Sequence, residues 1–272
     1  MLIKIGYDIE LSVSAPTALI YMLQVHPSRA GDLVAAENIR ISPGLPTDYY
    51  RDGFDNHCAR VHVPQGVTSI RLQNDATIRN SGLPDPVDEG AVQHAVADLP
   101  VSTLQFLLSS RYCEVDSELL AFAWSRFASA PFGWQRVQAI CDFVHQHLSF
   151  NYQRARATRT ALDGFREQVG VCRDFTHLAI TLCRCMNIPA RYVTGYLGDI
   201  GIPAVPYPMD FSAWFEVYLG DRWHTFDARH NTPRIGRIVV ARGRDAADVP
   251  ITMVFGVNSL VRFNVVTDEV LQ

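Results

Sequence analysis

The chain has 272 residues, of which 48% are hydrophobic and 19% are charged, a composition that argues against a disordered or fibrous protein. With 24 Lys and Arg against 28 Asp and Glu, the formal net charge is −4, so we expect neither nucleic acid nor a membrane surface as a partner. The apolar runs are far shorter than the roughly 18 residues of a membrane span. Residues 1–10 alternate apolar and polar residues, unlike a signal peptide, so we expect a cytoplasmic protein.

The first part of the chain is a series of short alternating segments separated by turn residues. Residues 3–13, 19–26, 39–42, 58–63 and 67–73 have this pattern, which is typical of strands in a β-sandwich. We therefore predict a β-sandwich domain over residues 1–85. Residues 80–90 are rich in Gly, Pro and Asp, and we place a linker over residues 86–104.

Beyond the linker, the hydrophobic period changes to that of helices. Apolar residues recur at helical spacing around residues 104–108, 119–127, 134–148 and 172–186. Residues 191–197, 211–219 and 222–227 are then rich in aromatic and β-branched residues, as strands are. Helices followed by an antiparallel sheet predict an α+β core over residues 105–272, closed by C-terminal strands within residues 252–270 whose partners are left open.

Six cysteines are spread along the chain without the spacing of a zinc site, so we expect free thiols, no metal and no cofactor. One of them, Cys172, lies at the first turn of the helix predicted for residues 172–186. Unpaired backbone N–H groups and the positive end of the helix dipole favour a thiolate at such a position. Cys172 is therefore a candidate nucleophile.

Four sequence blocks carry a resemblance to a known family. They are Gly170-x-Cys172-x-Asp174-Phe175-x-His177, Asn187-Ile188-Pro189-Ala190-Arg191-Tyr192, Ala213-Trp214-Phe215-Glu216-Val217 and Trp223-x-x-Phe226-Asp227. Over residues 105–245 the chain resembles the transglutaminase-like superfamily, a papain-related group whose bacterial members include proteins described as cysteine proteases with a β-rich N-terminal domain. The resemblance implies a papain-like core and a Cys–His–Asp triad that transfers the acyl group of a peptide or protein amide. It assigns the nucleophile to Cys172 and the orienting carboxylate to Asp227.

The histidine of the triad is missing from its usual place. In most members it precedes Ala-Trp, and that position is Ser212 here. A serine hydroxyl cannot accept the thiol proton near neutral pH. His230, just past the predicted strand, and His177, about 140° around the helix from Cys172, are the substitute bases that the sequence offers.

The predicted hairpin tests what position 212 faces. Gly220-Asp221 predicts a two-residue turn, which places position 212 diagonally opposite Asp227 on one face of the sheet. A histidine there would hydrogen-bond Asp227. Trp214 and Arg229 lie on the same face by period-2 alternation. We expect both to border the cleft, with Arg229 as a candidate partner of Asp227.

Two functions remain open at this point. The first is a cysteine peptidase or amidohydrolase, with transglutaminase activity less favoured because water needs no amine pocket. In that case an imidazole lies near Cys172, and iodoacetamide modifies the thiol quickly at pH 6. The second is a non-catalytic binding protein that keeps the fold without the base, and its thiol has a pKa near ~8.5.

Overall fold

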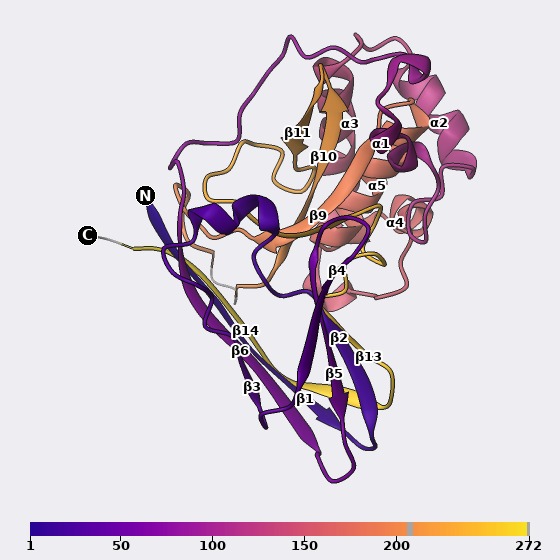
Figure 1. Cartoon of the computed structure of the whole chain (residues 1–272). Coiled ribbons are helices and arrows are strands. Elements are labelled where there is room, and N and C mark those ends of the chain that lie inside the picture. The colour runs from indigo at the N-terminus through magenta and orange to yellow at the C-terminus, as the bar shows by residue number, and fades with distance from the viewer. Residues whose placement is uncertain (206–208, 271–272) are drawn as a thin grey trace.

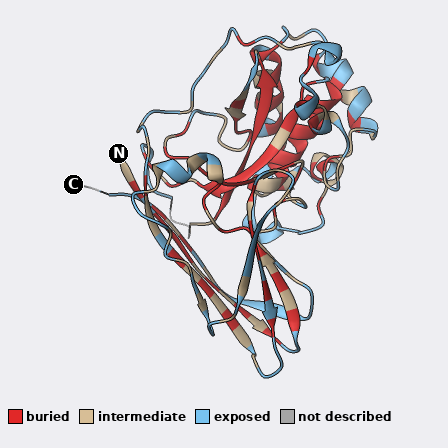
Figure 2. Cartoon of the chain, in the orientation of Figure 1, coloured by how far each residue is buried: buried red, intermediate tan, exposed pale blue. Residues whose placement is uncertain are grey.

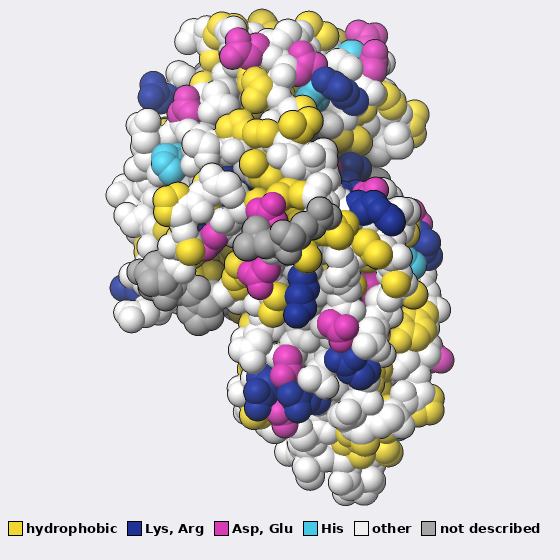
Figure 3. Space-filling model, turned by 90° about the vertical axis from the view of Figure 1, so that its left-hand side faces the viewer, with side chains coloured by type: hydrophobic (Ala, Val, Ile, Leu, Met, Phe, Trp, Pro, Cys, Tyr) yellow, Lys and Arg dark blue, Asp and Glu magenta, His cyan; other side chains and the backbone are white. Residues whose placement is uncertain are grey.

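The computed structural model describes residues 1–205 and 209–270, which form two lobes (Figure 1). The lower lobe in that view contains strands, and the upper lobe contains helices and a second sheet. Buried residues run through the interior of both lobes (Figure 2). On the face shown in Figure 3, basic and acidic side chains are intermixed and do not gather by sign.

The strand lobe is a sandwich of two four-stranded antiparallel sheets. Its strands are β1 (Leu2–Val13), β2 (Thr17–Tyr21), β3 (Arg40–Ser42), β4 (Thr47–Arg51), β5 (His57–Val63), β6 (Ser69–Arg79), β13 (Thr252–Val254) and β14 (Asn258–Glu269). One sheet has the order β14-β1-β6-β3 and the other β13-β2-β5-β4. Alternate side chains of β1, such as Ile3, Ile5 and Ile9, are fully buried between the sheets. The period-2 pattern predicted this burial correctly.

The C-terminal strands correct the predicted domain limits. We expected residues 105–272 to form one core, but β14 pairs antiparallel with β1 from Asn258 to Glu269, and β13 pairs with β2. The sandwich is therefore built from both ends of the chain, and Figure 1 shows the two termini at the same end of it. Local periodicity finds a strand but carries no information about a partner some 250 residues away. It also missed the short strand β4.

The other lobe is an antiparallel sheet packed against helices, with strand order β11-β10-β9-β12. Its elements are α1 (Val101–Leu104), α2 (Glu118–Phe127), α3 (Trp134–His147), α4 (Ala161–Glu167), α5 (Cys172–Cys185), β7 (Ser149–Phe150), β8 (Val169–Gly170), β9 (Ala190–Tyr196), β10 (Ser212–Leu219), β11 (Arg222–Phe226) and β12 (Ile238–Gly243). Short 3₁₀ turns are η1 (Pro27–Asp32), η2 (Val96–Asp98), η3 (Gln105–Leu107) and η4 (Tyr152–Arg154).

Helix α5 is the centre of this lobe. It packs on β10 and β9 and is flanked by α2, α3 and α4. Nearly every one of its residues is buried, because it lies between the sheet and the outer helices. The α+β class predicted from the sequence is confirmed. Within the described residues, no helix has the length and apolar character needed to cross a membrane.

We predict that a charge inside β14 destabilises the sandwich, because β14 is part of its core. Val265 is 6% exposed and lies opposite Tyr7, whereas Val261 on the same strand is 59% exposed. Val265→Asp should cost about 3 kcal/mol of unfolding free energy, because it buries an unpaired carboxylate. Val261→Asp, the matched control, should cost little. Urea unfolding measures both, and equal effects would contradict the assignment of β14 to the core.

Candidate active site

Cys172 is the first residue of α5, as the sequence predicted. The turn before it is held by Asp174, whose Oδ2 accepts hydrogen bonds from the Val171 N–H at 2.9 Å and from Arg159 at 3.0 Å. A Cβ at Gly170 would lie 2.5 Å from the Cβ of Asp174, so only glycine fits. The Gly-x-Cys-x-Asp block therefore fixes the sulfur at a helix N-terminus through one buried carboxylate.

The predicted hairpin register is confirmed. Leu219 pairs with Arg222 and Phe215 with Phe226. The strand β11 ends at Phe226, one residue before Asp227. Asp227 is therefore the first residue of a turn and does not continue the ladder.

Asp227 holds His230 through this turn. Its Oδ1 accepts the backbone N–H groups of Arg229 and His230 at 3.0 and 3.1 Å, an arrangement that aspartate favours in turns. The chain consequently folds back, and the Nδ1 of His230 lies 2.8 Å from the Oδ2 of Asp227. His230 thus meets the carboxylate that the family pattern reserves for a histidine at position 212.

Arg237 is the cation that pairs with Asp227, which corrects the expected partner Arg229. Its Nη2 lies 2.9 Å from the Oδ2 of Asp227, and both side chains are buried. The Nε of Arg237 donates to Asp85 at 2.8 Å. Arg229 contributes only its backbone N–H to Asp227. This network of three charges has no signal in the sequence, because its members are separated by up to 152 residues.

The pKa of Asp227 follows from these neighbours. Burial by itself raises the pKa of Asp227, but Arg237 and His230 outweigh it and hold the pKa well below its usual range. Asp227 is therefore ionised at neutral pH and can only accept hydrogen bonds. The hydrogen of this contact must then be on Nδ1 of His230, and Nε2 is the ring nitrogen that Asp227 does not engage.

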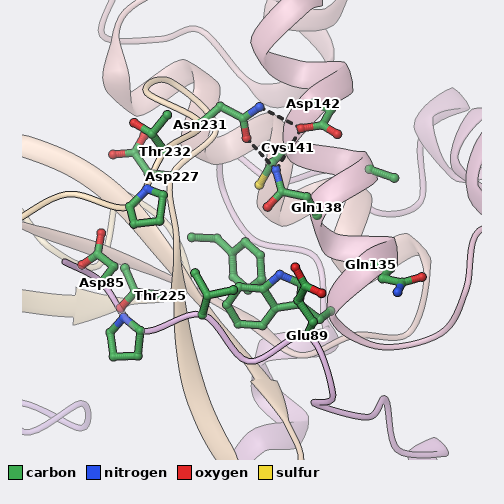
Figure 4. A pocket seen from close by; sticks show the side chains of 16 residues that line it. Asp85, Glu89, Gln135, Gln138, Cys141, Asp142, Thr225, Asp227, Asn231 and Thr232 are labelled. Atoms are coloured by element: carbon green, nitrogen blue, oxygen red, sulfur yellow. Dashed lines mark hydrogen bonds between the residues drawn. The ribbon is translucent and has the colours of Figure 1, made fainter.

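Helix α3 fixes the turn from its other side (Figure 4). Asn231 donates to Asp142 at 2.8 Å and accepts from Gln138 at 2.9 Å. The Nδ1 of His145 lies 2.9 Å from the carbonyl oxygen of Arg229. Gln138, Asp142 and Asn231 line a cavity of about 400 Å³ that lies between α3, the segment 85–89 and Asp227. The turn is thus held by side chains that sequence reasoning did not select.

A second cavity, of about 220 Å³, lies on the side of the turn where His230 and Ser212 are found. Its lining includes Ser212, Arg229 and His230. The hydroxyl of Ser212 is buried without a hydrogen-bond partner among the described residues. Asp199, Ile202, Val205, Met209 and Asp210 also line it, and Pro206, Tyr207 and Pro208 lie outside the described residues.

The Cys172 sulfur lies close to this second cavity without lining it. Burial raises the pKa of the Cys172 thiol to about 11, while the guanidinium of Arg229 and the N–H of Ala213 act in the opposite direction. Ala213 follows Ser212, and Arg229 lines the cavity, so the sulfur is next to that wall. Only 8% of the Cys172 surface is exposed. The thiol is neutral in the resting protein, contrary to the expectation from the helix N-terminus alone, because desolvation dominates.

Two other residues predicted for the site, His177 and Trp214, are packed in the interior of the protein. His177 is completely buried; its ring stacks on Tyr112, and its Nε2 accepts the N–H of Ala246 at 3.2 Å. Burial holds the pKa of His177 well below its usual value, and we do not assign it as the base. Trp214 is 0% exposed, under the guanidinium of Arg237, so it supports the ion pair and does not border the second cavity. Among the described residues there is no cluster of metal-binding side chains.

We predict that Arg237→Met lowers the unfolding free energy by about 3–5 kcal/mol at pH 7, because it leaves the Asp227 charge buried and unpaired. The folded-state pKa of Asp227 is depressed, so its stabilising contribution is present above the unfolded pKa of ~3.9 and is lost as the pH falls. Without Arg237 that pKa rises, so the loss of stability should shrink between pH 7 and pH 4.

Arg60→Met is the control, because Arg60 pairs with Asp48 on the exposed surface. It should change stability little at either pH. Denaturant unfolding of both variants at the two pH values measures the effect. A loss in Arg237→Met that does not depend on pH would contradict the pairing.

Comparisons with known proteins agree with this architecture. Residues 120–228 match the family model described as the transglutaminase-like superfamily. The crystal structure titled "a Putative Cysteine Protease from Cytophaga hutchinsonii" is 28% identical and superposes with a TM-score of 0.84, covering 100% of this chain and 92% of that one.

Sequence relatives are found in mycobacteria. An uncharacterized protein of Mycobacterium tuberculosis is 27% identical over 224 residues, which are 74% of this chain and 69% of the relative. One of Mycobacterium leprae is 33% identical over 93 residues, and this match spans 33% of each chain. The family match includes Cys172, Ser212 and Asp227 but ends two residues before His230. The fold and this match show that residues 120–228 form a transglutaminase-like core.

Proposed function

We propose that the protein is a cysteine peptidase or amidohydrolase with the triad Cys172, His230 and Asp227. The observation that carries the proposal is the 2.8 Å contact between His230 Nδ1 and Asp227 Oδ2, made by a histidine that lines the same cavity as Ser212. The base comes from the turn after β11 and not from the start of β10. The whole-chain likeness to the structure described as a "Putative Cysteine Protease" supports the proposal.

The reaction begins with a neutral thiol, because burial raises the pKa of Cys172 to about 11. The sulfur attacks the carbonyl carbon of the amide while its proton passes to Nε2 of His230. Asp227 stabilises the imidazolium that forms, since its carboxylate stays ionised. The thiol therefore loses its proton during the attack, and no thiolate has to form beforehand.

The oxyanion of the tetrahedral intermediate needs donors near the sulfur. The N–H of Cys172 is in the first helical turn, where N–H groups have no intrahelical acceptor. The unpartnered hydroxyl of Ser212 lines the cavity and is a second donor. Ser212 then has a chemical use that is compatible with the absence of a base at that position.

The intermediate collapses when the C–N bond breaks and the leaving amine takes the proton from His230. Water then attacks the thioester, giving its proton to Nε2, and the carboxylic acid is released with the thiol restored. We favour water over an amine as the acceptor because water requires no second binding pocket. The substrate is a peptide or protein amide.

The second candidate is a binding protein without turnover. The observation that favours it is the burial of the nucleophile, which is only 8% exposed. In this case the Asp227–His230 pair is a structural contact, and removing the imidazole changes stability without changing any reaction. Turnover assays on variants therefore separate the two functions.

We predict that His230→Gln lowers kcat for hydrolysis of generic peptide and glutaminyl-amide substrates by about 10²–10⁴-fold, the usual contribution of a general base. Cys172→Ala should remove the activity. His62→Gln, an exposed histidine of the sandwich, is the control and should retain the parent rate. Full activity in His230→Gln would exclude it as the base.

Ser212→His tests whether the base has moved or has been lost. If His230 is the base, a histidine at position 212 competes for Asp227 and removes the Ser212 hydroxyl, so hydrolysis should fall. Steady-state rates on the same substrates measure this. Appearance of turnover in the variant, from an inactive parent, would instead identify a decayed site and support the binding protein.

A further inference from the structure

Arg229 presents a cation to the cavity beside the nucleophile. Its guanidinium carbon lies 3.8 Å from the ring centre of Phe150, and both residues line the cavity of about 220 Å³. Stacking on an aromatic ring holds the planar guanidinium in place at little entropic cost. The position is therefore set by the fold before any ligand binds.

This cation lacks a carboxylate partner within the described part of the chain. The ion pairs found at 4.0 Å or less do not include the guanidinium of Arg229. The other cation of the cavity, Arg234, lies 4.0 Å from Asp199, and Asp199 also accepts the N–H of Val205 at 2.8 Å. The charges of Arg234 and Asp199 therefore offset each other. Asp210 is the other carboxylate that lines the cavity with Arg229.

Asp210 does not neutralise Arg229 by contact. Burial raises the pKa of Asp210, against the opposing effects of the Phe211 N–H and of Arg229 itself. An aspartate in this environment gives up its charge more readily than an exposed one. Of the side chains that act on the sulfur, Arg229 most lowers the pKa of Cys172, whereas Asp210 raises it.

The rest of the cavity wall is largely apolar. It includes the side chains of Tyr152, Leu197, Ile202, Val205, Met209 and Phe211. An apolar wall strengthens a charge-assisted hydrogen bond, because it excludes the water that would compete for the guanidinium. A planar guanidinium fork matches the two oxygens of a carboxylate.

We propose that Arg229 binds a carboxylate of the acyl donor, so that the substrates are amides that carry a free carboxylate or an acidic side chain next to an apolar group. The proposal rests on Cys172 as the nucleophile of the proposed function. It extends that function by assigning Arg229 as a specificity residue and by naming the charge of the substrate.

The test compares alkylation of Cys172 by iodoacetate and by iodoacetamide in the full-length protein. In both reactions the sulfur forms a bond to carbon, iodide leaves, and the thiol proton goes to solvent. The two reagents differ only in carrying a carboxylate or a neutral amide. Mass spectrometry of the Cys172 peptide gives each rate, and N-acetylcysteine at the same pH and ionic strength gives the reference ratio.

If Arg229 binds carboxylates, the ratio of the iodoacetate rate to the iodoacetamide rate at Cys172 should exceed the reference by about tenfold, the effect of one charge-assisted hydrogen bond. Arg229→Gln should return the ratio to the reference, and Arg229→Lys should keep part of it. Both reagents consume thiolate, so a change in the thiol pKa cancels in the ratio. Asp210→Asn should raise the ratio further.

Arg173→Gln is the matched control, because Arg173 is adjacent to Cys172 in sequence but does not line the cavity. Its ratio should equal that of the parent. A parent ratio equal to the reference, or equal losses in Arg229→Gln and Arg173→Gln, would overturn the proposal. Alkylation requires no turnover, so the two proposals can fail separately. A protein that does not hydrolyse amides but has a raised ratio would contradict only the proposed hydrolysis. A protein that hydrolyses amides but has the reference ratio would contradict only the role of Arg229.

Discussion

The buried ion pair between Asp227 and Arg237 determines how this site can work. Two unlike charges, 2.9 Å apart and almost without solvent, need hydrogen bonds to most of their remaining polar atoms, and among the described residues only the Nη1 of Arg237 in this pair has no partner. Asp85 takes the Nε of Arg237, and His230 together with two backbone N–H groups takes the oxygens of Asp227. Because Asp85 lies in the segment that connects the lobes, that segment helps to position Arg237 against Asp227.

If the proposed function holds, this arrangement explains how a triad can keep its carboxylate while its imidazole comes from a different place. A carboxylate that directly follows a strand and caps its own turn can accept a hydrogen bond from a histidine across the sheet. It can equally accept one from a histidine three residues further along the chain. Ser212 is compatible with the second solution because its small side chain leaves space where an imidazole at that position would stand. The same change frees a hydroxyl in the cavity. The loss of the usual histidine therefore does not by itself indicate loss of chemistry.

The sequence predicted those features that depend on neighbours along the chain. The start of α5 at Cys172, the register of the hairpin and the α+β order of elements were all accessible, because helix period, turn residues and alternation act locally. The features that the sequence could not predict depend on contacts between distant residues. They are the pairing of β14 with β1, the pairing of Arg237 with Asp227, and the burial that keeps the Cys172 thiol neutral. The mistaken assignment of Arg229 to Asp227 had the same origin, since sheet alternation was extended past Phe226, where β11 ends.

The neutral thiol also changes what the rest of the site must supply. A cysteine that is already a thiolate needs a neighbouring cation but no base at the moment of attack, whereas a thiol with a pKa near 11 must transfer its proton as the sulfur–carbon bond forms. The proposed reaction then depends on the orientation of the His230 imidazole, which is held by Asp227 and by the turn at residues 227–230. In the proposed mechanism, the free charge of Arg229 lowers the cost of that transfer, because it lowers the pKa of Cys172, and a bound carboxylate would remove this effect. A substrate bound through Arg229 would therefore increase the dependence of the reaction on the imidazole.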